Sequence, residues 1–183
     1  ELDAALGGLD LVIANAGVGA APGADPLAWG TLRGPLHVNL CGAAATLTGA
    51  LPAMIARGRG HLVGIGSLSS FGPLPGAAAY GTPKAGLSML LGCLDLDLAD
   101  TGVAVTDVHL GFVRTAMVAG STHPMPQLAE PDEVARHVVR RLLDRPRRIV
   151  FPRALGAATR AFARLPEPIR RTVLARVLAR RAT

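Results

Sequence analysis

The chain of 183 residues has few aromatic residues and two cysteines. Aromatics make up 3% of it, so we expect one domain whose core is built from Ala, Val and Leu. Cys41 and Cys93 lie in apolar stretches, which favours buried free thiols and a reducing, cytoplasmic location over a disulfide framework. We expect no secretory signal, and no apolar run reaches the ~20 residues of a membrane span.

Charge is distributed unevenly along the chain. Residues 1–133 hold 5 Lys or Arg and 11 Asp or Glu, a net charge of −6, whereas residues 134–183 hold 14 Arg and 2 acids, a net charge of +12. Because the basic excess is confined to the tail and no aromatic residues interleave with it, we expect no nucleic-acid partner. The five histidines share no ligand spacing, so no metal site is expected.

Short apolar runs alternate with segments of helical periodicity. The runs predict strands at Leu9–Asn15, His61–Ile65, Val103–Leu110 and Arg148–Phe151. The helical segments between them are Leu36–Arg57, Ala79–Ala99 and Pro131–Leu143, and Asp25-Pro26 is a further helix start. This alternation predicts an α/β fold with a parallel sheet and helices on both faces.

Candidate functional residues follow three of the predicted strands. Asn15–Gly17, Ser67 and Gly111–Thr115 each come just after the carboxyl end of a strand. Open α/β sheets bind ligands at that edge, so the sequence predicts a ligand site there.

A phenol and an ammonium begin the helix that follows Ser67. Tyr80 and Lys84 are four residues apart, so they lie on one side of a helix. The ordinary pKa of Tyr is about 10, and a nearby positive charge lowers it, which makes the pair a plausible acid/base device. Ser67, from a separate loop, is placed to bind a carbonyl oxygen. Y-x-x-x-K alone also occurs by chance in many helices.

Further motifs agree with this pair. NAG (Asn15–Gly17) follows an apolar run, HVNLCGA places Asn39 in the next helix, and VAVTDVHLGFVRT is similar to a strand followed by a Pro-Gly-x-Val-x-Thr loop. With Ser67, Tyr80 and Lys84, the chain resembles the short-chain dehydrogenase/reductase family over roughly Leu9–Pro152. The resemblance implies a Rossmann-like, doubly wound parallel sheet.

The resemblance also implies that the front of the fold is missing. It makes Leu9–Gly17 the fourth strand, so the first three strands and the phosphate-binding glycines would precede Glu1. The stretch AGVGAAPG is not that fingerprint, because Pro22 stands where its helix should run. We therefore expect residues 1–152 to be a partial catalytic domain without the pyrophosphate and adenosine site.

The resemblance assigns roles to four catalytic residues. Tyr80 is the general acid in carbonyl reduction and the base in alcohol oxidation, and Ser67 binds the substrate oxygen. Lys84 binds the nicotinamide ribose and lowers the pKa of Tyr80, while Asn39 holds a water that links Lys84 to solvent. The cofactor is then NAD or NADP, and the substrate is an alcohol, ketone or aldehyde. For Asn39, local bonding within its helix remains an alternative.

The resemblance further assigns cofactor contacts and a lid. Asn15, Ala16 and Gly17 would line the adenine-ribose side, and Val113 and Thr115 would meet the nicotinamide carboxamide. Leu110 stands where the family has Pro, which makes the following loop less rigid. Met117–Gln127 would be the substrate lid. Ser69 and Ser70 are interpreted as turn residues.

The tail, residues 153–183, reads as a basic amphipathic helix. Its apolar stripe consists of Ile169, Val173, Leu174, Val177 and Leu178, among arginines. We favour packing of this stripe on the domain or on a sister subunit over contact with an anionic membrane surface. We also expect a homodimer or homotetramer through helices 36–57 and 79–99. The alternative function is a truncated, inactive chain that acts through oligomerisation or membrane contact.

Overall fold

One parallel sheet organises the fold. The computed structural model describes residues 2–20, 24–25, 28–119 and 124–179. Four strands lie in the order β1-β2-β3-β4, with bounds Leu11–Ala14, Gly60–Ser67, Val103–Leu110 and Arg148–Phe151. All neighbours are parallel, because a helical crossover follows each strand but the last. The predicted parallel sheet is therefore confirmed, with β3 and β4 at their expected bounds.

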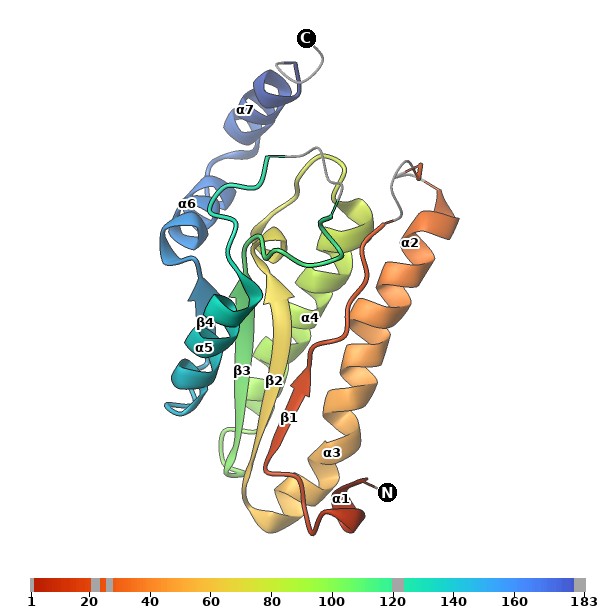
Figure 1. Ribbon diagram of the computed structural model, residues 1–183, viewed down its shortest axis with the longest axis vertical. Coiled ribbons are helices and arrows are strands. Elements are labelled where there is room, and N and C mark those ends of the chain that lie inside the picture. Colours follow the sequence, from red (N-terminus) through yellow and green to blue (C-terminus); the bar gives the residue numbers. More distant parts are fainter. Residues whose placement is uncertain (1, 21–23, 26–27, 120–123, 180–183) are drawn as a thin grey trace.

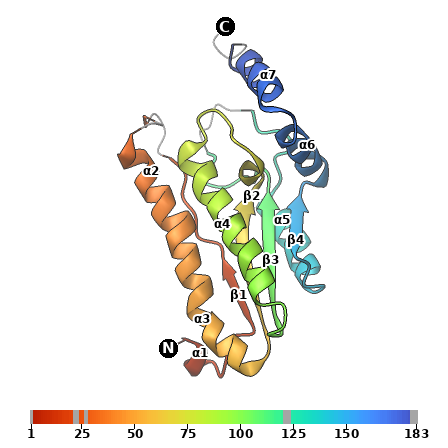
Figure 2. The same ribbon diagram turned by 180° about the vertical axis from the view of Figure 1, so that it is seen from behind.

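Helices cover both faces of this sheet. One face carries a continuous helix, made of α2 (Trp29–Leu36), a π-helical segment (His37–Gly42) and α3 (Ala43–Arg57), together with α4 (Ala78–Asp97) (Figure 2). The opposite face carries α5 (Pro131–Leu142) over β3 and β4 (Figure 1). A short α1 (Leu2–Ala5) precedes β1. The expected helix start at Pro26 lies outside the described residues.

The core is aliphatic and lies in two layers. Between the sheet and helices α3 and α4, the buried residues include Leu47, Met54, Leu62 and Leu91. Between the sheet and α5, the buried residues include Val63, Val108, Val134 and Ile149. Neighbouring strand residues such as Leu62 and Val63 point to opposite faces, so one strand serves both layers. Leu and Val therefore fill most of the core in place of aromatic residues, as the composition predicts.

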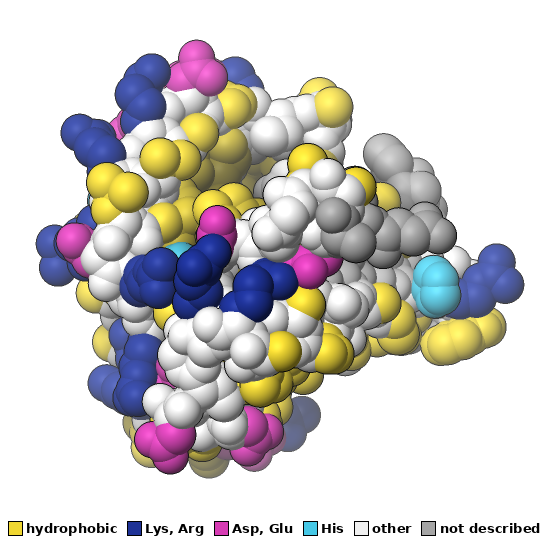
Figure 3. All heavy atoms as spheres, turned by 90° about the horizontal axis from the view of Figure 1, so that it is seen from below, with side chains coloured by type: hydrophobic (Ala, Val, Ile, Leu, Met, Phe, Trp, Pro, Cys, Tyr) yellow, Lys and Arg dark blue, Asp and Glu magenta, His cyan; other side chains and the backbone are white. Residues whose placement is uncertain are grey.

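The first strand is covered on one face only. Val12 and Ala14 pack toward α3, whereas Leu11 and Ile13 are 45% and 42% exposed. Strands of parallel sheets are usually buried on both faces, so this side of β1 is unusually open. On the face of the molecule drawn in Figure 3, a hollow has hydrophobic side chains on its floor and basic side chains, Lys or Arg, beside it.

Two expectations about the helices are wrong. Cys41 and Cys93 were expected to be buried but are exposed. The expectation failed because both helices are apolar over most of their surface, so apolar neighbours in the sequence do not show which side of a helix faces the sheet. The continuous helix Trp29–Arg57 is long and apolar enough to span a membrane by length and composition, which the separate sequence runs did not indicate. In the fold its Leu47 and Met54 face the sheet.

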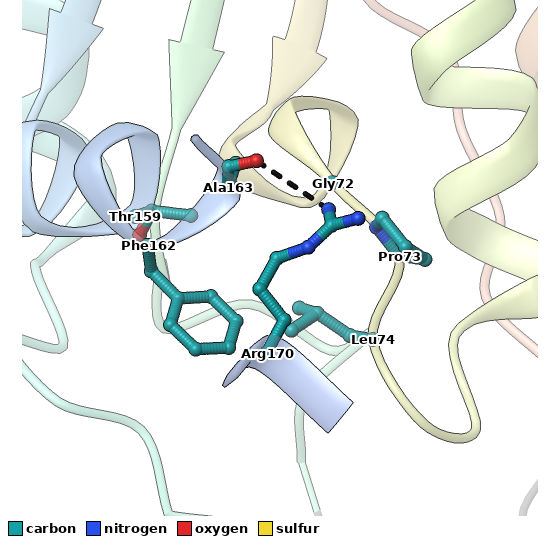
Figure 4. A pocket seen from close by; sticks show the side chains of 7 residues that line it. All are labelled: Gly72, Pro73, Leu74, Thr159, Phe162, Ala163 and Arg170. Atoms are coloured by element: carbon teal, nitrogen blue, oxygen red, sulfur yellow. Dashed lines mark hydrogen bonds between the residues drawn. The ribbon is translucent and has the colours of Figure 1, made fainter. Parts of the chain in front are cut away.

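The tail begins as part of the packed structure. Helix α6 (Arg153–Ala163) follows β4, and the guanidinium of Arg160 lies 5.5 Å from the ring centre of Phe71. Helix α7 (Glu167–Ala179) follows, and Arg170 donates to the carbonyl of Ala163 at 3.4 Å. Arg170 also borders a cavity of about 10 Å³ against residues 72–74 (Figure 4). This is room for about one water, so the side chain of Arg170 lies close against the loop that follows Ser67.

The apolar stripe of α7 is covered only in part by its own domain where it is described, since Leu174 is half-buried. Ile169 is 48% exposed, and Val173 is exposed as well. The side chains of Val177 and Leu178 lie outside the described residues. Packing of Ile169 and Val173 on their own domain is therefore wrong, because Arg170 takes the inner side of the helix. A sister subunit or a membrane surface as the cover remains a prediction.

If α4 pairs with a second copy of the chain, a charged residue introduced on the exposed side of α4 should weaken the dimer. Met89 on α4 and Val139 on α5 are both exposed, on opposite faces of the sheet. We expect Met89→Arg to lower the mass by light scattering at micromolar concentration, because an arginine cannot be desolvated cheaply in an apolar interface. Val139→Arg is the control. A wild-type monomer, or equal masses for all three proteins, would contradict pairing through α4.

Candidate active site

Ser67 ends β2 and is held by the turn that follows. Residues Leu68–Phe71 form a 3₁₀ turn, and the amide of Ser69 donates to Ser67 Oγ at 3.2 Å. The hydroxyl of Ser69 also bonds Ser67 Oγ, at 3.0 Å. The interpretation of Ser69 and Ser70 as turn residues is confirmed, and the turn in addition orients Ser67.

Tyr80 and Lys84 lie at the start of α4, beside the end of β2. A side-chain hydrogen bond joins Ser67 and Tyr80. The Nζ atom of Lys84 lies 5.9 Å from the ring centre of Tyr80 and donates to the carbonyl of Ile65 at 2.7 Å. Lys84 is only 4% exposed. The structure therefore brings together the three residues that the sequence places on two separate elements.

Burial dominates the electrostatics of this group. It raises the pKa of Tyr80, and the hydrogen bond from Ser67 opposes the rise only in part. Burial also lowers the pKa of Lys84. The expected lowering of the Tyr80 pKa by Lys84 is thus not what the structure shows, because removal from water penalises the phenolate more than its surroundings favour it. The phenol keeps its proton near neutral pH, as a proton donor must.

Asn39 fastens the loop after β1. It is fully buried in the π-helical segment, accepts from the amide of Val18 at 2.7 Å and donates to the carbonyl of Val18 at 2.8 Å. The alternative of bonding within its own helix is therefore wrong. The water-holding role of Asn39 stays a prediction.

Gly17 lies between Asn39 and Lys84. A Cβ added there would be 3.3 Å from Asn39 Oδ1 and 3.5 Å from Lys84 Nζ, so a side chain would enter the space between them. Asn15 and Ala16 beside it are exposed. A buried ammonium beside a position where glycine leaves space suits a ligand rich in hydroxyl groups, such as the ribose of a dinucleotide. The assignment of Asn15, Ala16 and Gly17 to the adenine-ribose side stays a prediction.

The loop after β3 meets the loop after β1. A Cβ added at Gly19 would lie 3.6 Å from Met117 Cγ. Val113 forms a bridge with Ala129 and packs on the core under α5, whereas Thr115 is exposed. The structure therefore turns the Val113 side chain toward the core and leaves Thr115 free to contact a ligand. Within the expected lid, residues 120–123 lie outside the described part of the chain.

Leu110 occupies the position where the resemblance expects proline. It is the last residue of β3 and pairs with Ser67 on one side and Phe151 on the other. Its place inside a regular strand ladder gives the start of this loop a rigid support.

Sequence reasoning missed two residues behind Ser67. Asp107 and His109 of β3 are both buried, and the imidazole of His109 contacts Ser70 in the turn that holds Ser67. The sequence did contain a signal for them. Strands of parallel sheets are usually continuous apolar runs, and these two ionisable residues interrupt such a run.

Comparison with known proteins agrees with this geometry. The family model for short chain dehydrogenases matches residues 1–125, and the chain belongs to this family. An uncharacterized oxidoreductase of Myxococcus xanthus is 44% identical over 168 residues, which cover 92% of this chain and 66% of the relative. An uncharacterized oxidoreductase of Staphylococcus aureus is 32% identical over 133 residues, 73% of this chain and 58% of the relative. The chain thus spans about two thirds or less of these relatives.

Solved structures share the fold. A short-chain dehydrogenase from Sphingobium yanoikuyae in complex with NADPH matches with a TM-score of 0.71 at 23% identity, over 86% of this chain and 66% of that one. An alcohol dehydrogenase from the archaeon Thermococcus sibiricus, complexed with 5-hydroxy-NADP, matches with a TM-score of 0.67 at 25% identity, over 82% and 65%. The predicted Rossmann-like α/β class is confirmed.

The bonds of Asn39 make a prediction that needs no substrate. Asn39→Ala removes both partners of the Val18 main chain, which costs about 1–3 kcal/mol of unfolding free energy if these groups stay unsatisfied. We expect faster hydrogen exchange at the Val18 amide, measured by NMR. Asn15→Ala, an exposed neighbour, is the control. Unchanged exchange in Asn39→Ala would contradict the fastening role.

Proposed function

We propose that the protein is an NAD(P)-dependent oxidoreductase that interconverts an alcohol and a ketone or aldehyde by hydride transfer. The observation that carries this proposal is the joint placement of Ser67, Tyr80 and buried Lys84 at the carboxyl edge of the sheet. Membership in the family supports the same reaction class.

The residues divide the work by their atoms. In reduction, the hydride joins the carbonyl carbon while the phenol of Tyr80 gives its proton to the carbonyl oxygen, so that an alcohol and a phenolate result. The hydroxyl of Ser67, which has one proton, donates to the same oxygen and so stabilises the charge that develops on it. The ammonium of Lys84 favours the phenolate electrostatically. Alcohol oxidation is the reverse sequence.

The cofactor supplies or accepts the hydride when it is bound. Lys84 would hold its ribose hydroxyls, because an ammonium has three N–H donors and Ile65 takes one of them. The backbone at Asn15, Ala16 and Gly17 would allow close approach on one side, and Thr115 would contact it from the loop after β3.

A second proposal covers the setting of this activity. We propose a cytoplasmic homodimer or homotetramer, supported by exposed apolar side chains on α3 and α4 such as Ile55, Met89 and Leu96. The competing function, an inactive chain that acts through its helices and tail, gains support from the exposure of Ile169 and Val173. Titration with NAD(H) and NADP(H) separates the two, because only the oxidoreductase requires binding.

The role of Tyr80 predicts a selective loss of turnover. In the complete protein that carries this sequence, Tyr80→Phe should lower kcat by about 10²–10⁴-fold, because the proton donor is lost while the ring remains. Cofactor affinity by calorimetry should change little. Cys93→Ser, on the exposed side of the same helix, is the control and should keep kcat. Retention of more than about a tenth of the kcat in Tyr80→Phe would argue against this role.

The raised pKa of Tyr80 predicts the pH dependence. Burial keeps the phenol protonated through neutral pH, so carbonyl reduction should be flat there and fall only above about pH 10. Alcohol oxidation needs the phenolate and should rise with pH into the alkaline range. Lys84→Met removes the positive charge, so the rising limb should move to higher pH. If the rising limb of the pH–rate profile for alcohol oxidation is at the same pH in Lys84→Met and in the wild type, Lys84 acts in cofactor binding alone.

A further inference from the structure

Strand β3 carries a buried ionisable pair that the proposed reaction does not use. Asp107 and His109 alternate along the strand, so both side chains lie on the same face of the sheet. The side chain of His109 is 0% exposed, and that of Asp107 is 7% exposed. The neighbouring buried positions of β3 are mostly valine. Burying ionisable side chains is commonly no more stabilising than burying apolar residues of similar size, so packing alone does not account for Asp107 and His109.

A continuous chain of contacts runs from α4 to the carbonyl of Ser67. Ser88 Oγ donates to Asp107 Oδ2 at 2.5 Å, and the same carboxylate oxygen lies 2.7 Å from His109 Nε2. His109 Nδ1 lies 2.9 Å from Ser70 Oγ, which donates to the carbonyl of Ser67 at 2.6 Å. The chain therefore ties α4, β3 and the end of β2 together.

Proton counting fixes the direction of this chain. The hydroxyl of Ser70 has one proton, and its shortest contact is with the carbonyl of Ser67, an acceptor only. The Ser70 oxygen must then accept from Nδ1 of His109. On its other side the ring faces the Asp107 carboxylate, with Nε2 2.7 Å from Oδ2, although this contact does not have the geometry of a hydrogen bond. Asp107 thereby holds the ring in the orientation in which Nδ1 faces Ser70.

The surroundings keep the ring and the carboxylate in place. The ring of Phe71 lies against that of His109, with 4.5 Å between centres. On β2, a Cβ added at Gly66 would lie 2.9 Å from the carbonyl of Val108 and 3.2 Å from Asp107 Oδ1. The absence of a side chain at Gly66, directly before Ser67, therefore makes room for the carboxylate.

We propose that His109 and Asp107 are positioning residues for Ser67. Through Ser70, and through the 3.3 Å contact of His109 Nδ1 with the Ser67 carbonyl, they hold the main chain of Ser67. They thereby set the direction of the Ser67 hydroxyl toward Tyr80. The inference rests on the proposed function, because a misdirected Ser67 hydroxyl would lower the rate of that reaction. Neither residue contacts Tyr80 or Lys84 in the described structure.

Kinetics of matched variants test the proposal in the complete protein. His109→Leu should lower kcat by about 10- to 100-fold, since small misplacements of reacting groups have effects of this size. KM and cofactor affinity should change less than about threefold, because the cofactor side of the site is untouched. The control is His61→Leu, which removes another buried histidine of the sheet, bonded to Thr106 at 2.8 Å and remote from Ser67. An equal kcat in the two variants would overturn the proposal.

Milder variants keep the test valid if His109→Leu folds poorly. Asn at position 109 keeps a side-chain amide near the position of Nδ1, so His109→Asn should recover part of the lost kcat. Ser70→Ala should reproduce the loss, and the double variant Ser70→Ala with His109→Leu should be no slower than the slower single variant. Losses that multiply would show that the two residues do not act through one path, which contradicts the chain of contacts.

A structural measurement separates this proposal from the proposed function. We expect amide hydrogen exchange in the turn Leu68–Phe71 to accelerate in His109→Leu and in Asp107→Asn, but not in His61→Leu. This readout needs no turnover. If the wild-type protein catalyses no oxidation or reduction yet the turn loosens as expected, the proposed function fails and the holding of Ser67 stands. Unchanged exchange in both variants overturns the positioning role.

Discussion

The burial of a single ammonium organises the carboxyl edge of this sheet. Lys84 is 4% exposed, and among the described residues it donates to one acceptor, the carbonyl of Ile65. An ammonium with so few partners is costly to bury, and its neighbours are arranged around it. Gly17 leaves space beside Nζ, Asn39 fastens the loop that carries Gly17, and Tyr80 lies one helical turn before it. A bound ligand rich in hydroxyl groups would offset the free-energy cost of burying Lys84, because its hydroxyls would accept the remaining hydrogen bonds of the ammonium.

Much of the fold could be predicted because parallel strands are short apolar runs. The bounds of Val103–Leu110 and Arg148–Phe151 agree with the sequence patterns, whereas β1 begins at Leu11 because the amide of Leu9 is engaged by Asp3. The outer sides of the helices could not be predicted. When Ala, Gly and Leu surround a helix, the pattern does not say which side faces the sheet, and Cys41 and Cys93 were therefore misplaced.

The catalytic residues of the site could be predicted because their types and their spacing along the chain indicate a particular chemistry. Ser67, Tyr80 and Lys84 meet as their spacing indicates, but the pKa of Tyr80 depends on how deeply the ring is buried, and spacing carries no information on this. The bonds of Asn39 to Val18 could not be predicted either, because only the tertiary fold brings these two residues together. The pair Asp107 and His109 was visible as charge in an apolar strand, yet its partner Ser70 comes from another element.

The central claim is that Lys84 is buried in order to hold a nicotinamide dinucleotide. The most direct measurement is calorimetric titration of the complete protein with NADH and NADPH, alongside Lys84→Met and Arg59→Met. Arg59 is an exposed cation paired with Asp10 at 3.2 Å, which controls for a general loss of positive charge. The account predicts that the wild type and Arg59→Met bind one of the two dinucleotides and that Lys84→Met binds it at least about tenfold more weakly, since bonds to a charged group contribute about 1.5–3 kcal/mol. A folded wild type that binds neither, or equal affinity in all three proteins, would contradict it.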